Sequence, residues 1–436
     1  MVMERRGDVK QSYLMYNLKK KDILYMTKPF DIPKTLVYEA YQLVKANRGA
    51  AGVDQESLDA FDLNWKDNLY KLWNRLSSGS YFPPAVRGVQ IPKKQGGHRL
   101  LGVPTVSDRI SQMVVKLVFE PNVEPVFHED SYGYRPGKSA LDAIATTRAR
   151  CWKYNWVLEF DIKGLFDNID HVLLMKAVKK HTDNKWVLLY IERWLKAPIQ
   201  MPNGDIVART CGVPQGGVIS PILSNLFLHY VFDMWMTQNH ANKPWARYAD
   251  DALTHCRTEA EAQALLVELK LRFEECKLEL HPTKTKIVYC KDGRRKGSYP
   301  NTNFKFLGYE FRARSAKNVQ RNELFASFLP AVGKDTRVAM NAKIRKMNVR
   351  NRTDMELVDI AKWLNPILQG WINYYGKFYK TALMPVLEHF NETLVKWALR
   401  KYDNLKYKHR GWALIKKIMK QSPQLFAHWK LMFKVA

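Results

Sequence analysis

The 436-residue sequence predicts an α+β fold, in which an antiparallel sheet backed by helices precedes an all-helical, basic domain. Two observations support this fold class. In the middle of the chain, short apolar stretches typical of strands alternate with stretches of helical apolar spacing, in the order β-α-α-β-β-α-β. From about residue 331 onward, apolar residues recur at helical spacing. No internal repeat is visible.

The composition favours a protein that binds nucleic acid. Apolar residues make up 46% of the chain, which excludes disorder as its main state. The 70 Lys and Arg residues outnumber the 42 Asp and Glu residues, and the net charge of +28 suits a polyanionic partner. Residues 331–436 hold 21 basic and 7 acidic residues, and therefore half of this excess charge. The same stretch has 14 aromatic residues, which can pack in a core or stack on bases.

Targeting and redox features are weak in this sequence. No apolar run reaches the ~18–20 residues of a membrane span, and the N-terminus lacks the apolar core of a secretory signal. The five cysteines form no CxxC pair. We therefore expect reduced thiols, no membrane partner and a cytoplasmic location.

Three aspartates follow predicted strands. The apolar strand Trp156–Phe160 ends at Asp161, and a hairpin predicted around Tyr248 carries Asp250 and Asp251 at its tip. Negative charge at the end of a buried strand is unfavourable unless a cation compensates it. Carboxylate oxygens suit Mg²⁺, and two such ions ~3.5–4 Å apart can bridge an attacking hydroxyl and a leaving pyrophosphate. Taken alone, the Asp-Asp pair also fits a solvated turn, and Asp161 also fits a helix cap.

The remaining elements of the middle region follow from caps and spacing. We expect helices over 170–180, with Asp170 as the cap, from Ser220-Pro221 onward, and over 259–276. We expect strands over 278–281 and within 285–290. The linker into the helical domain is expected in 291–303 or 312–323, because both stretches are polar.

A series of motifs in one order resembles the palm of reverse transcriptases. The motifs are FDIKGLFDNIDH (160–171), GVPQGGVISPILSNLFLH (212–229), RYADD (247–251), LELHPTKTKI (278–287) and FKFLGYEF (304–311). Upstream, IPKKQGGHRLLGVPTVSDR (91–109) and SYGYRPGKSALDAI (131–144) resemble the fingers of bacterial group II intron reverse transcriptases. Downstream, LNPILQGWINYYGKFYK (364–380) is similar to the maturase, or thumb, segment of that family. The chain thus resembles a bacterial group II intron-encoded reverse transcriptase/maturase.

This resemblance implies a right-hand polymerase fold. The implied parts are an N-terminal extension (1–60), fingers (61–155), a palm (156–311), a helical thumb/maturase domain (312–400) and a basic nucleic-acid-binding segment (401–436). The implied activity is that of an RNA-directed DNA polymerase, which copies RNA into cDNA and assists splicing and retrohoming of its intron. The implied partners are an RNA template, a DNA primer, dNTPs and a cognate group II intron RNA, in the bacterial cytoplasm.

Metal and proton-transfer roles are carried over residue by residue. The resemblance implies two Mg²⁺ ions, with Mn²⁺ as a substitute, at Asp161, Ile162, Asp250 and Asp251. Lys284 in the HPTKTK segment matches the lysine that protonates pyrophosphate, and Lys286 is an alternative for this role.

Nucleotide contacts are implied at four further positions. Phe166, five residues after Asp161, matches the aromatic ring that leaves no room for a ribose 2′-hydroxyl. Gln215 lies between a proline and two glycines, where backbone can approach a nucleotide closely. Lys93 and Arg99 resemble the fingers residues that clamp the triphosphate, although the adjacent Lys94 fits the first role equally well.

A primer grip is implied at Phe306, Leu307 and Gly308, where the glycine permits close backbone approach to the primer end. The sequence departs from many relatives at two points. Ala249 precedes the two aspartates, as is usual in group II members, whereas many retroviral relatives have methionine there. Leu165 precedes Phe166, where a second phenylalanine is often found.

Nothing after Lys380 resembles an HNH-type endonuclease. That stretch lacks cysteine, and its histidines, His389, His409 and His428, stand far apart in the sequence. We therefore expect the endonuclease-lacking type, which makes cDNA but does not nick duplex DNA.

Three alternative functions share part of this sequence pattern. An RNA-dependent RNA polymerase shares the palm, but Phe166 and the Tyr-Ala-Asp-Asp hairpin argue against it. The intact carboxylates argue against a maturase that only binds RNA. A free-standing reverse transcriptase domesticated for defence or repair stays open.

Overall fold

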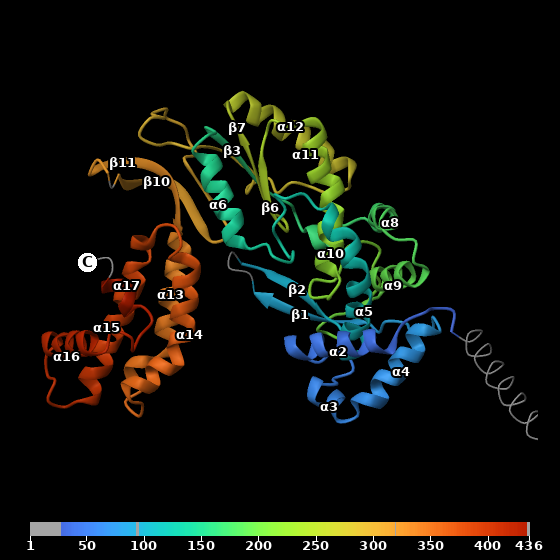
Figure 1. Cartoon of the computed structure of the whole chain (residues 1–436), viewed down its shortest axis with the longest axis horizontal. Helices are drawn as coiled ribbons and strands as arrows, with labels where there is room; N and C mark the ends of the chain where they lie inside the picture. The colour runs from blue at the N-terminus through green and yellow to red at the C-terminus, as the bar shows by residue number, and fades with distance from the viewer. Residues whose placement is uncertain (1–27, 93–95, 319, 434–436) are drawn as a thin grey trace, which may run out of the picture. The chain divides into compact units, whose positions relative to one another are not determined.

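The computed structural model describes residues 28–92, 96–318 and 320–433 (Figure 1). The chain divides into two units, each built from discontinuous segments. The first unit holds the described residues up to Gly137, then Ile162–Asn242 and Glu268–His281. The second unit holds Lys138–Asp161, Lys243–Val267 and the described residues from Pro282 onward.

The first unit is mostly helical, with a small sheet. Its helix α5 is buried along most of its length, polar residues included, so it forms the centre of this core. The sheet has the order β2-β1-β4-β5, and β1 and β2 form an antiparallel pair. The elements are α2 (Lys34–Asn47), α3 (Leu58–Leu63), α4 (Trp65–Ser77), β1 (Val86–Pro92), β2 (His98–Val103), α5 (Val106–Val123), η1 (Glu124–Val126), α7 (Leu165–Asn168), α8 (His171–Lys179), α9 (Lys185–Lys196), β4 (Ile199–Gln200), β5 (Ile206–Val207), α10 (Ser220–Leu228), η2 (His229–Asp233) and α11 (Met234–Asn239).

Two helix starts predicted in this unit can be checked. The Asp170 side chain accepts a hydrogen bond from the Leu173 amide, which confirms Asp170 as the cap of α8. Helix α10 has Pro221 in its first turn, as predicted, but the capping position is occupied by Ile219. Ser220 is therefore the first helical residue and not the cap.

The second unit contains an antiparallel sheet of order β6-β7-β3-β8. Its strands are β3 (Trp156–Asp161), β6 (Trp245–Tyr248), β7 (Asp251–Cys256) and β8 (Lys286–Tyr289). Helix α6 (Ala140–Cys151) packs beside β6, and Arg150 Nη1 donates to the Trp245 carbonyl at 2.5 Å (Figure 1). The predicted antiparallel sheet with a helix against it is confirmed.

Helix α12 (Glu259–Glu275) begins in the second unit and ends in the first. Leu265, Leu269 and Phe273 are buried, which confirms the predicted apolar stripe. The strand predicted over 278–281 is wrong, because Leu280 makes only a single bridge, to Ile162.

The second unit contains a second sheet in the region where the linker was predicted. Strands β9 (Asn303–Phe306), β10 (Tyr309–Asn318) and β11 (Glu323–Val332) pair antiparallel in the order β11-β10-β9. The polar stretch 312–323 therefore lies in the β10–β11 hairpin, and 291–303 leads from β8 to β9. Both linker predictions are wrong, since the C-terminal helices begin at Lys334, directly after β11.

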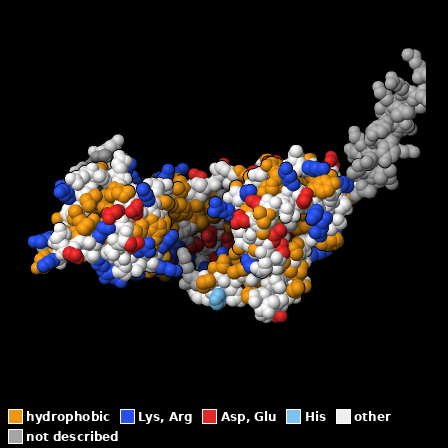
Figure 2. Space-filling model, turned by 90° about the horizontal axis from the view of Figure 1, so that it is seen from below, with side chains coloured by type: hydrophobic (Ala, Val, Ile, Leu, Met, Phe, Trp, Pro, Cys, Tyr) orange, Lys and Arg blue, Asp and Glu red, His pale blue; other side chains and the backbone are white. Residues whose placement is uncertain are grey.

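The C-terminal helices share one apolar core. The elements are α13 (Lys334–Met347), η3 (Val349–Asn351), α14 (Leu357–Tyr375), η4 (Lys380–Ala382), α15 (Met384–Lys401), α16 (Lys408–Gln421) and α17 (Trp429–Phe433). Ile415, Phe426 and Trp429 are fully buried in this core together with Trp397. The helices within residues 401–433 thus complete the same core as the helices before them, while the predicted role of this segment in binding nucleic acid stays a prediction. Lys and Arg side chains lie on the surface of this helical part (Figure 2).

Two predictions about the whole chain can also be compared with the structure. The five cysteines are free thiols, and Cys211 is exposed while the other four are buried. Among the helices of the described residues, none combines the length and apolar character needed to cross a membrane.

Candidate active site

The β3–β7 pairing brings two of the predicted aspartates face to face. Asp161, the last residue of β3, lies directly opposite Asp251, the first residue of β7. Asp250 precedes it in the turn of the β6–β7 hairpin, in which Ala249 has a left-handed φ of 57°. This conformation is uncommon for a residue with a Cβ. The fully buried Arg247 donates through Nη1 to the Ala249 carbonyl at 3.2 Å, which braces the turn.

The carboxylates at this end of the sheet repel one another. The pKa of Asp251 rises to about 7, because of desolvation and then because Asp250, Asp161 and Glu159 disfavour another negative charge. The Asp251 residue is exposed to solvent at the start of β7, which limits its desolvation, whereas the repulsion by Asp250, Asp161 and Glu159 remains. The pKa of Glu159 is also raised, mainly by burial. The sheet end is therefore a place where added positive charge is stabilising.

Two lysines supply part of that charge. Lys284 Nζ lies 2.6 Å from Asp161 Oδ2, and Lys286 Nζ lies 3.3 Å from Glu159 Oε2. Of the two lysines that the sequence left open, Lys284 is therefore the one paired with a predicted metal-binding aspartate.

The donor set suits a divalent cation. Carboxylate oxygens are hard ligands, and the raised pKa of Asp251 marks an excess of negative charge that a cation would relieve. As the side chains stand, no three Asp, Glu, His or Cys groups among the described residues are arranged to hold a metal ion. Lys284 occupies one oxygen of Asp161, so it would have to leave that oxygen for a cation to bind there.

In the first unit, a cavity of about 140 Å³ gathers two of the predicted nucleotide contacts. Phe166 and Gln215 line it, together with Asp167, Arg209 and Cys211. The Phe166 carbonyl accepts from the Val213 amide at 2.7 Å, which ties the Gln215 loop to α7. Gln215 Nε2 donates to Asp167 Oδ1 at 3.4 Å.

Glycines of the Gln215 loop allow these close approaches. Gly212 has a φ of 80°, and a Cβ there would lie 2.7 Å from the Phe166 carbonyl oxygen. Gly216 has a φ of 112°, and a Cβ there would lie 2.4 Å from the Gly102 carbonyl oxygen. A side chain at either position would push the loop away from its neighbours.

Other predicted nucleotide contacts are not brought to this cavity. Arg99 is exposed on β2 and does not line it. Lys93 and the alternative Lys94 lie outside the described residues. Ile162 is buried and bridges Leu280.

The predicted primer grip is a tight turn between β9 and β10. Leu307 and Gly308 form the turn, with φ values of 51° and 80°, and Phe306 is buried before it. Tyr374 in α14 donates its hydroxyl to the Leu307 carbonyl at 2.8 Å. A Cβ on Gly308 would lie 2.9 Å from the Tyr375 hydroxyl, so the glycine permits close contact with this helix.

The sequence did not predict a buried network of hydrogen bonds in the first unit. Asp108 accepts hydrogen bonds from Tyr81, Trp194 and Gln112, and burial raises its pKa to about 6. Gln112 Oε1 in turn accepts from the Val218 amide at 2.7 Å, just after the Gln215 loop. The available signal was Asp108 and Gln112, two polar residues four apart on one face of a helix.

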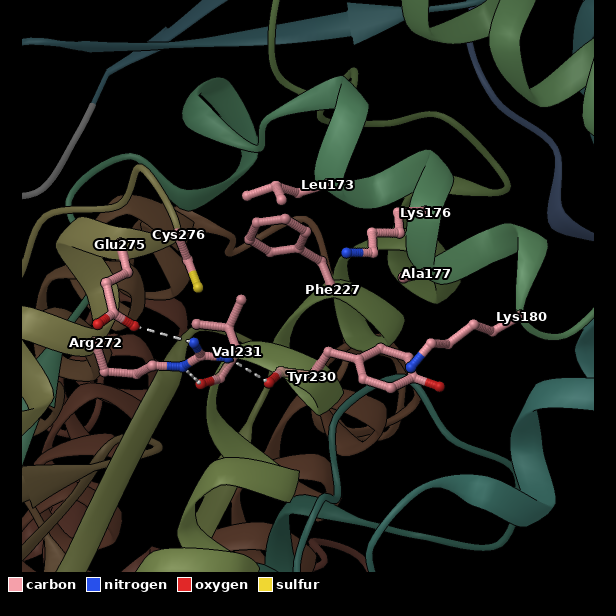
Figure 3. Close-up of a pocket in the computed structure, with 10 residues that line it drawn as sticks. All are labelled: Leu173, Lys176, Ala177, Lys180, Phe227, Tyr230, Val231, Arg272, Glu275 and Cys276. Atoms are coloured by element: carbon pink, nitrogen blue, oxygen red, sulfur yellow. Dashed lines mark hydrogen bonds and ion pairs between the residues drawn. The ribbon is translucent and has the colours of Figure 1, made fainter.

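A larger cavity, of about 320 Å³, lies elsewhere in the first unit, between α8, α10–η2 and α12 (Figure 3). It contains none of the predicted site residues. Its arginine, Arg272, donates to the carbonyls of Val231 and Tyr230 and pairs with Glu275 (Figure 3).

A sheet with an aspartate pair at a hairpin tip, a third aspartate opposite and a lysine beside it defines the palm of a nucleotide polymerase. Residues 91–311 match the family model described as reverse transcriptase (RNA-dependent DNA polymerase). The chain therefore belongs to the reverse transcriptase family. Residues 338–418 match the group II intron maturase-specific domain, which lies within the C-terminal helices.

Named relatives agree with this assignment. The group II intron-encoded protein LtrA of Lactococcus lactis subsp. cremoris is 27% identical over 466 residues, covering 86% of this chain and 73% of LtrA. Protein YkfC of Escherichia coli K12 is 33% identical over 294 residues, covering 58% of this chain and 77% of YkfC. A solved telomerase structure from Candida albicans shares 12% identity and a TM-score of 0.46, covering 87% of this chain and 68% of that one, a likeness too low to bear on the fold.

The family assignment confirms the predicted right-hand polymerase class, the RNA-directed DNA polymerase activity and the group II intron lineage. Reverse transcriptases use divalent metal ions, and both matched domains imply RNA binding.

Proposed function

We propose that this reverse transcriptase extends a DNA primer on an RNA template with dNTPs, using two Mg²⁺ ions at Asp161, Asp250 and Asp251. The observation that carries this proposal is the cross-strand pairing of Asp161 with Asp251 beside Asp250, where added positive charge is favoured. When bound, the two ions would activate the primer hydroxyl and neutralise the leaving pyrophosphate.

The chain's own residues have distinct parts in this scheme. Asp161, Asp250 and Asp251 hold the cations. Lys284 leaves Asp161 and delivers a proton to the departing pyrophosphate, for which its part-exposed Nζ is accessible. Phe166 packs under the deoxyribose and excludes a 2′-hydroxyl, and it is only half-buried in the cavity wall.

We also propose limits for the domains. We assign the fingers to 61–155, the palm to 156–311 and the helical thumb/maturase part to 334–433. The hairpin of β10 and β11 begins at Tyr309 and ends at Val332, so this palm limit falls within β10, and α16 and α17 share the thumb core. We propose that the basic surface of these helices binds a cognate group II intron RNA in the bacterial cytoplasm.

The test is primer extension by Asp250→Asn on a primed RNA template. The neutral amide removes metal-binding charge while leaving the basic surface intact, so extension should fall below detection with RNA affinity unchanged. Asp183→Asn, at an exposed aspartate between α8 and α9, is the matched control and should extend primers like the wild type. Robust Mg²⁺-dependent extension by Asp250→Asn would sink the assignment.

A maturase role that does not need DNA synthesis is favoured by the match of residues 338–418. On this proposal Asp250→Asn still promotes splicing of the cognate intron RNA. A splicing assay on that RNA measures the maturase activity directly. Trp429→Ala, which damages the helical core, should lose splicing in the same assay.

A further inference from the structure

The cavity that holds Phe166 and Gln215 also holds a guanidinium group that no described residue engages. Arg209 Nη1 is buried and has no hydrogen-bond partner. Among the described residues, no carboxylate lies within ion-pair distance of Arg209, and Asp167 acts on it only at longer range. Burial lowers the pKa of Arg209, which reflects the cost of holding this charge away from water.

Other partly buried arginines of the same unit differ from Arg209 in this respect. Arg193 donates to the carbonyls of Gly79 and Tyr81, and Arg109 donates to those of Arg48 and Ala50. Arg272, in the larger cavity, is held by two carbonyls and a carboxylate (Figure 3). The guanidinium groups of these three arginines are held by carbonyls within the protein, although Arg109 Nε, like Arg87 Nε on β1, is also buried without a partner. Arg209 keeps donors available to a ligand.

A buried guanidinium without a partner is costly unless an anion binds it. Guanidinium groups match phosphate oxygens in geometry as well as in charge. Among the described residues that line this cavity, Asp167 is the one carboxylate, and one of its oxygens is engaged by the Gln215 amide. We propose that Arg209 binds the triphosphate of the incoming dNTP, as a nucleotide-binding residue beside Phe166 and Gln215. This inference rests on the proposed function, since it assumes that the cavity is the dNTP site.

The cavity wall is complementary to a nucleotide in more than charge. Phe166 offers an apolar ring to the sugar, and Asp167 keeps one carboxylate oxygen that the Gln215 amide does not engage as an acceptor for the 3′-hydroxyl. Arg209 adds the positive group that a phosphate needs. A backbone phosphate of the template strand is the other source of the same chemistry, and the experiments below separate the two.

The first experiment measures steady-state extension with saturating primer–template and varied dNTP. Loss of a charge-assisted contact in Arg209→Ala should raise KM for dNTP roughly ten- to hundred-fold, with primer–template Kd unchanged. Arg209→Lys keeps the charge but not the paired N–H donors of the guanidinium group, so its KM should lie between those of the wild type and Arg209→Ala. Lys176→Ala removes the same charge from the wall of the other cavity and should leave KM unchanged (Figure 3).

The second experiment uses the exposed thiol of Cys211 as a reporter of the same cavity. Cys211 lines it, and the other four cysteines are buried, so iodoacetamide should label Cys211 first. Mass spectrometry of the labelled peptide follows the rate. Inorganic triphosphate or dNTP should slow labelling in the wild type and in Lys176→Ala, but not in Arg209→Ala.

The results separate this inference from the function on which it rests. If the wild type fails to extend any primer, the proposed function fails first. If the wild type extends but Arg209→Ala has the KM of Lys176→Ala, the Arg209 assignment alone is overturned. Protection of Cys211 by primer–template and not by triphosphate, or a weakened primer–template Kd with unchanged KM, would also overturn it in favour of a template contact.

Discussion

Lys284 Nζ lies 2.6 Å from Asp161 Oδ2, so a lysine holds one of the oxygens that a metal ion would take. The pair neutralises part of the charge between β3 and the hairpin tip when no cation is bound. Lys284 is also partly exposed, which leaves it free to turn toward a leaving group. The same side chain can therefore be a counter-ion in one state and a proton donor in another.

Replacing Lys284 by Gln should separate these two states. Without the competing ammonium group, Mg²⁺ should bind more tightly, whereas the single-turnover rate of nucleotide incorporation should fall by roughly 10²-fold or more if Lys284 is the acid. Rapid-quench extension and metal titration measure the two effects. Lys286→Gln, next to Glu159, should change the rate far less. Equal losses in both variants would contradict the assignment to Lys284.

Stabilisation by Mg²⁺ should depend on pH because of Asp251. Its pKa is raised to about 7 in the folded chain from 3.8, so its contribution to the free energy of unfolding falls as pH rises from about 4 to about 7. A cation binds the ionised form and reverses this loss. The rise in Tm on adding Mg²⁺ should thus be larger at pH 8 than at pH 6, as measured by scanning calorimetry. In Asp251→Asn the difference between the two pH values should shrink, and equal shifts in the wild type would refute the argument.

Replacing Phe166 by Ala should relax sugar selection. The ring is half-buried in the cavity wall, and its removal opens space beside the sugar. We expect the ratio of ribonucleotide to deoxyribonucleotide incorporation to rise by roughly ten- to hundred-fold. Single-nucleotide extension with rNTPs and dNTPs measures it, and Val172→Ala on the exposed surface of α8 is the control. An unchanged ratio would place the gate at another residue.

The Gln215 loop should loosen when Gln112 is replaced by Leu. The Val218 amide would lose its acceptor, and Asp108 would lose one of its donors. We expect a loss of about 1–3 kcal/mol in the free energy of unfolding, together with a raised KM for dNTP. Ser111→Ala on the same helix, where the hydroxyl donates to the Ser107 carbonyl and does not contact the Gln215 loop, should change KM little. Denaturant unfolding and extension kinetics test both parts, and a wild-type KM would show that the loop needs no such support.

The C-terminal helices should be needed for stability. Trp429 is fully buried and donates through Nε1 to Asn391 Oδ1 at 2.9 Å, so Trp429→Ala should cost about 3–5 kcal/mol. Tyr407→Ala, at a ring that is 59% exposed, should stay within about 0.5 kcal/mol of the wild type. Urea unfolding compares them. A neutral Trp429→Ala would show that α17 does not contribute to the stability of this core.

Local patterns were enough to predict the elements that carry the aspartates. The strand ending at Asp161 and the hairpin with Asp250 and Asp251 have short apolar runs whose ends are marked by charge, and they are buried as predicted. Helix α12 has its apolar residues on one face, and this face is the one that is buried. In these cases the chemistry of neighbouring residues decides the structure.

Other features depend on partners far away in the sequence. The polar stretch 312–323 resembles a linker in sequence, and pairing with β11 makes its first residues, 312–318, part of strand β10. The many basic residues after residue 401 lie on the surface of the helices. The few apolar residues that form their buried face do not stand out in the composition. The sequence did not mark Arg209 as a site residue. Its lack of a hydrogen-bond partner arises only because the segments of Phe166 and Gln215 fold around it.

The hydrogen bond from Tyr374 to Leu307 fastens the turn between β9 and β10 to α14. Tyr309, the residue after the turn, donates its hydroxyl to the Tyr374 carbonyl, which gives the joint a second fastening. Helix α14 lies within the stretch that matches the maturase-specific domain. An RNA that displaces this helix would carry the turn with it, so a primer contact at this turn, as predicted for Phe306, Leu307 and Gly308, would be coupled to RNA binding at α14.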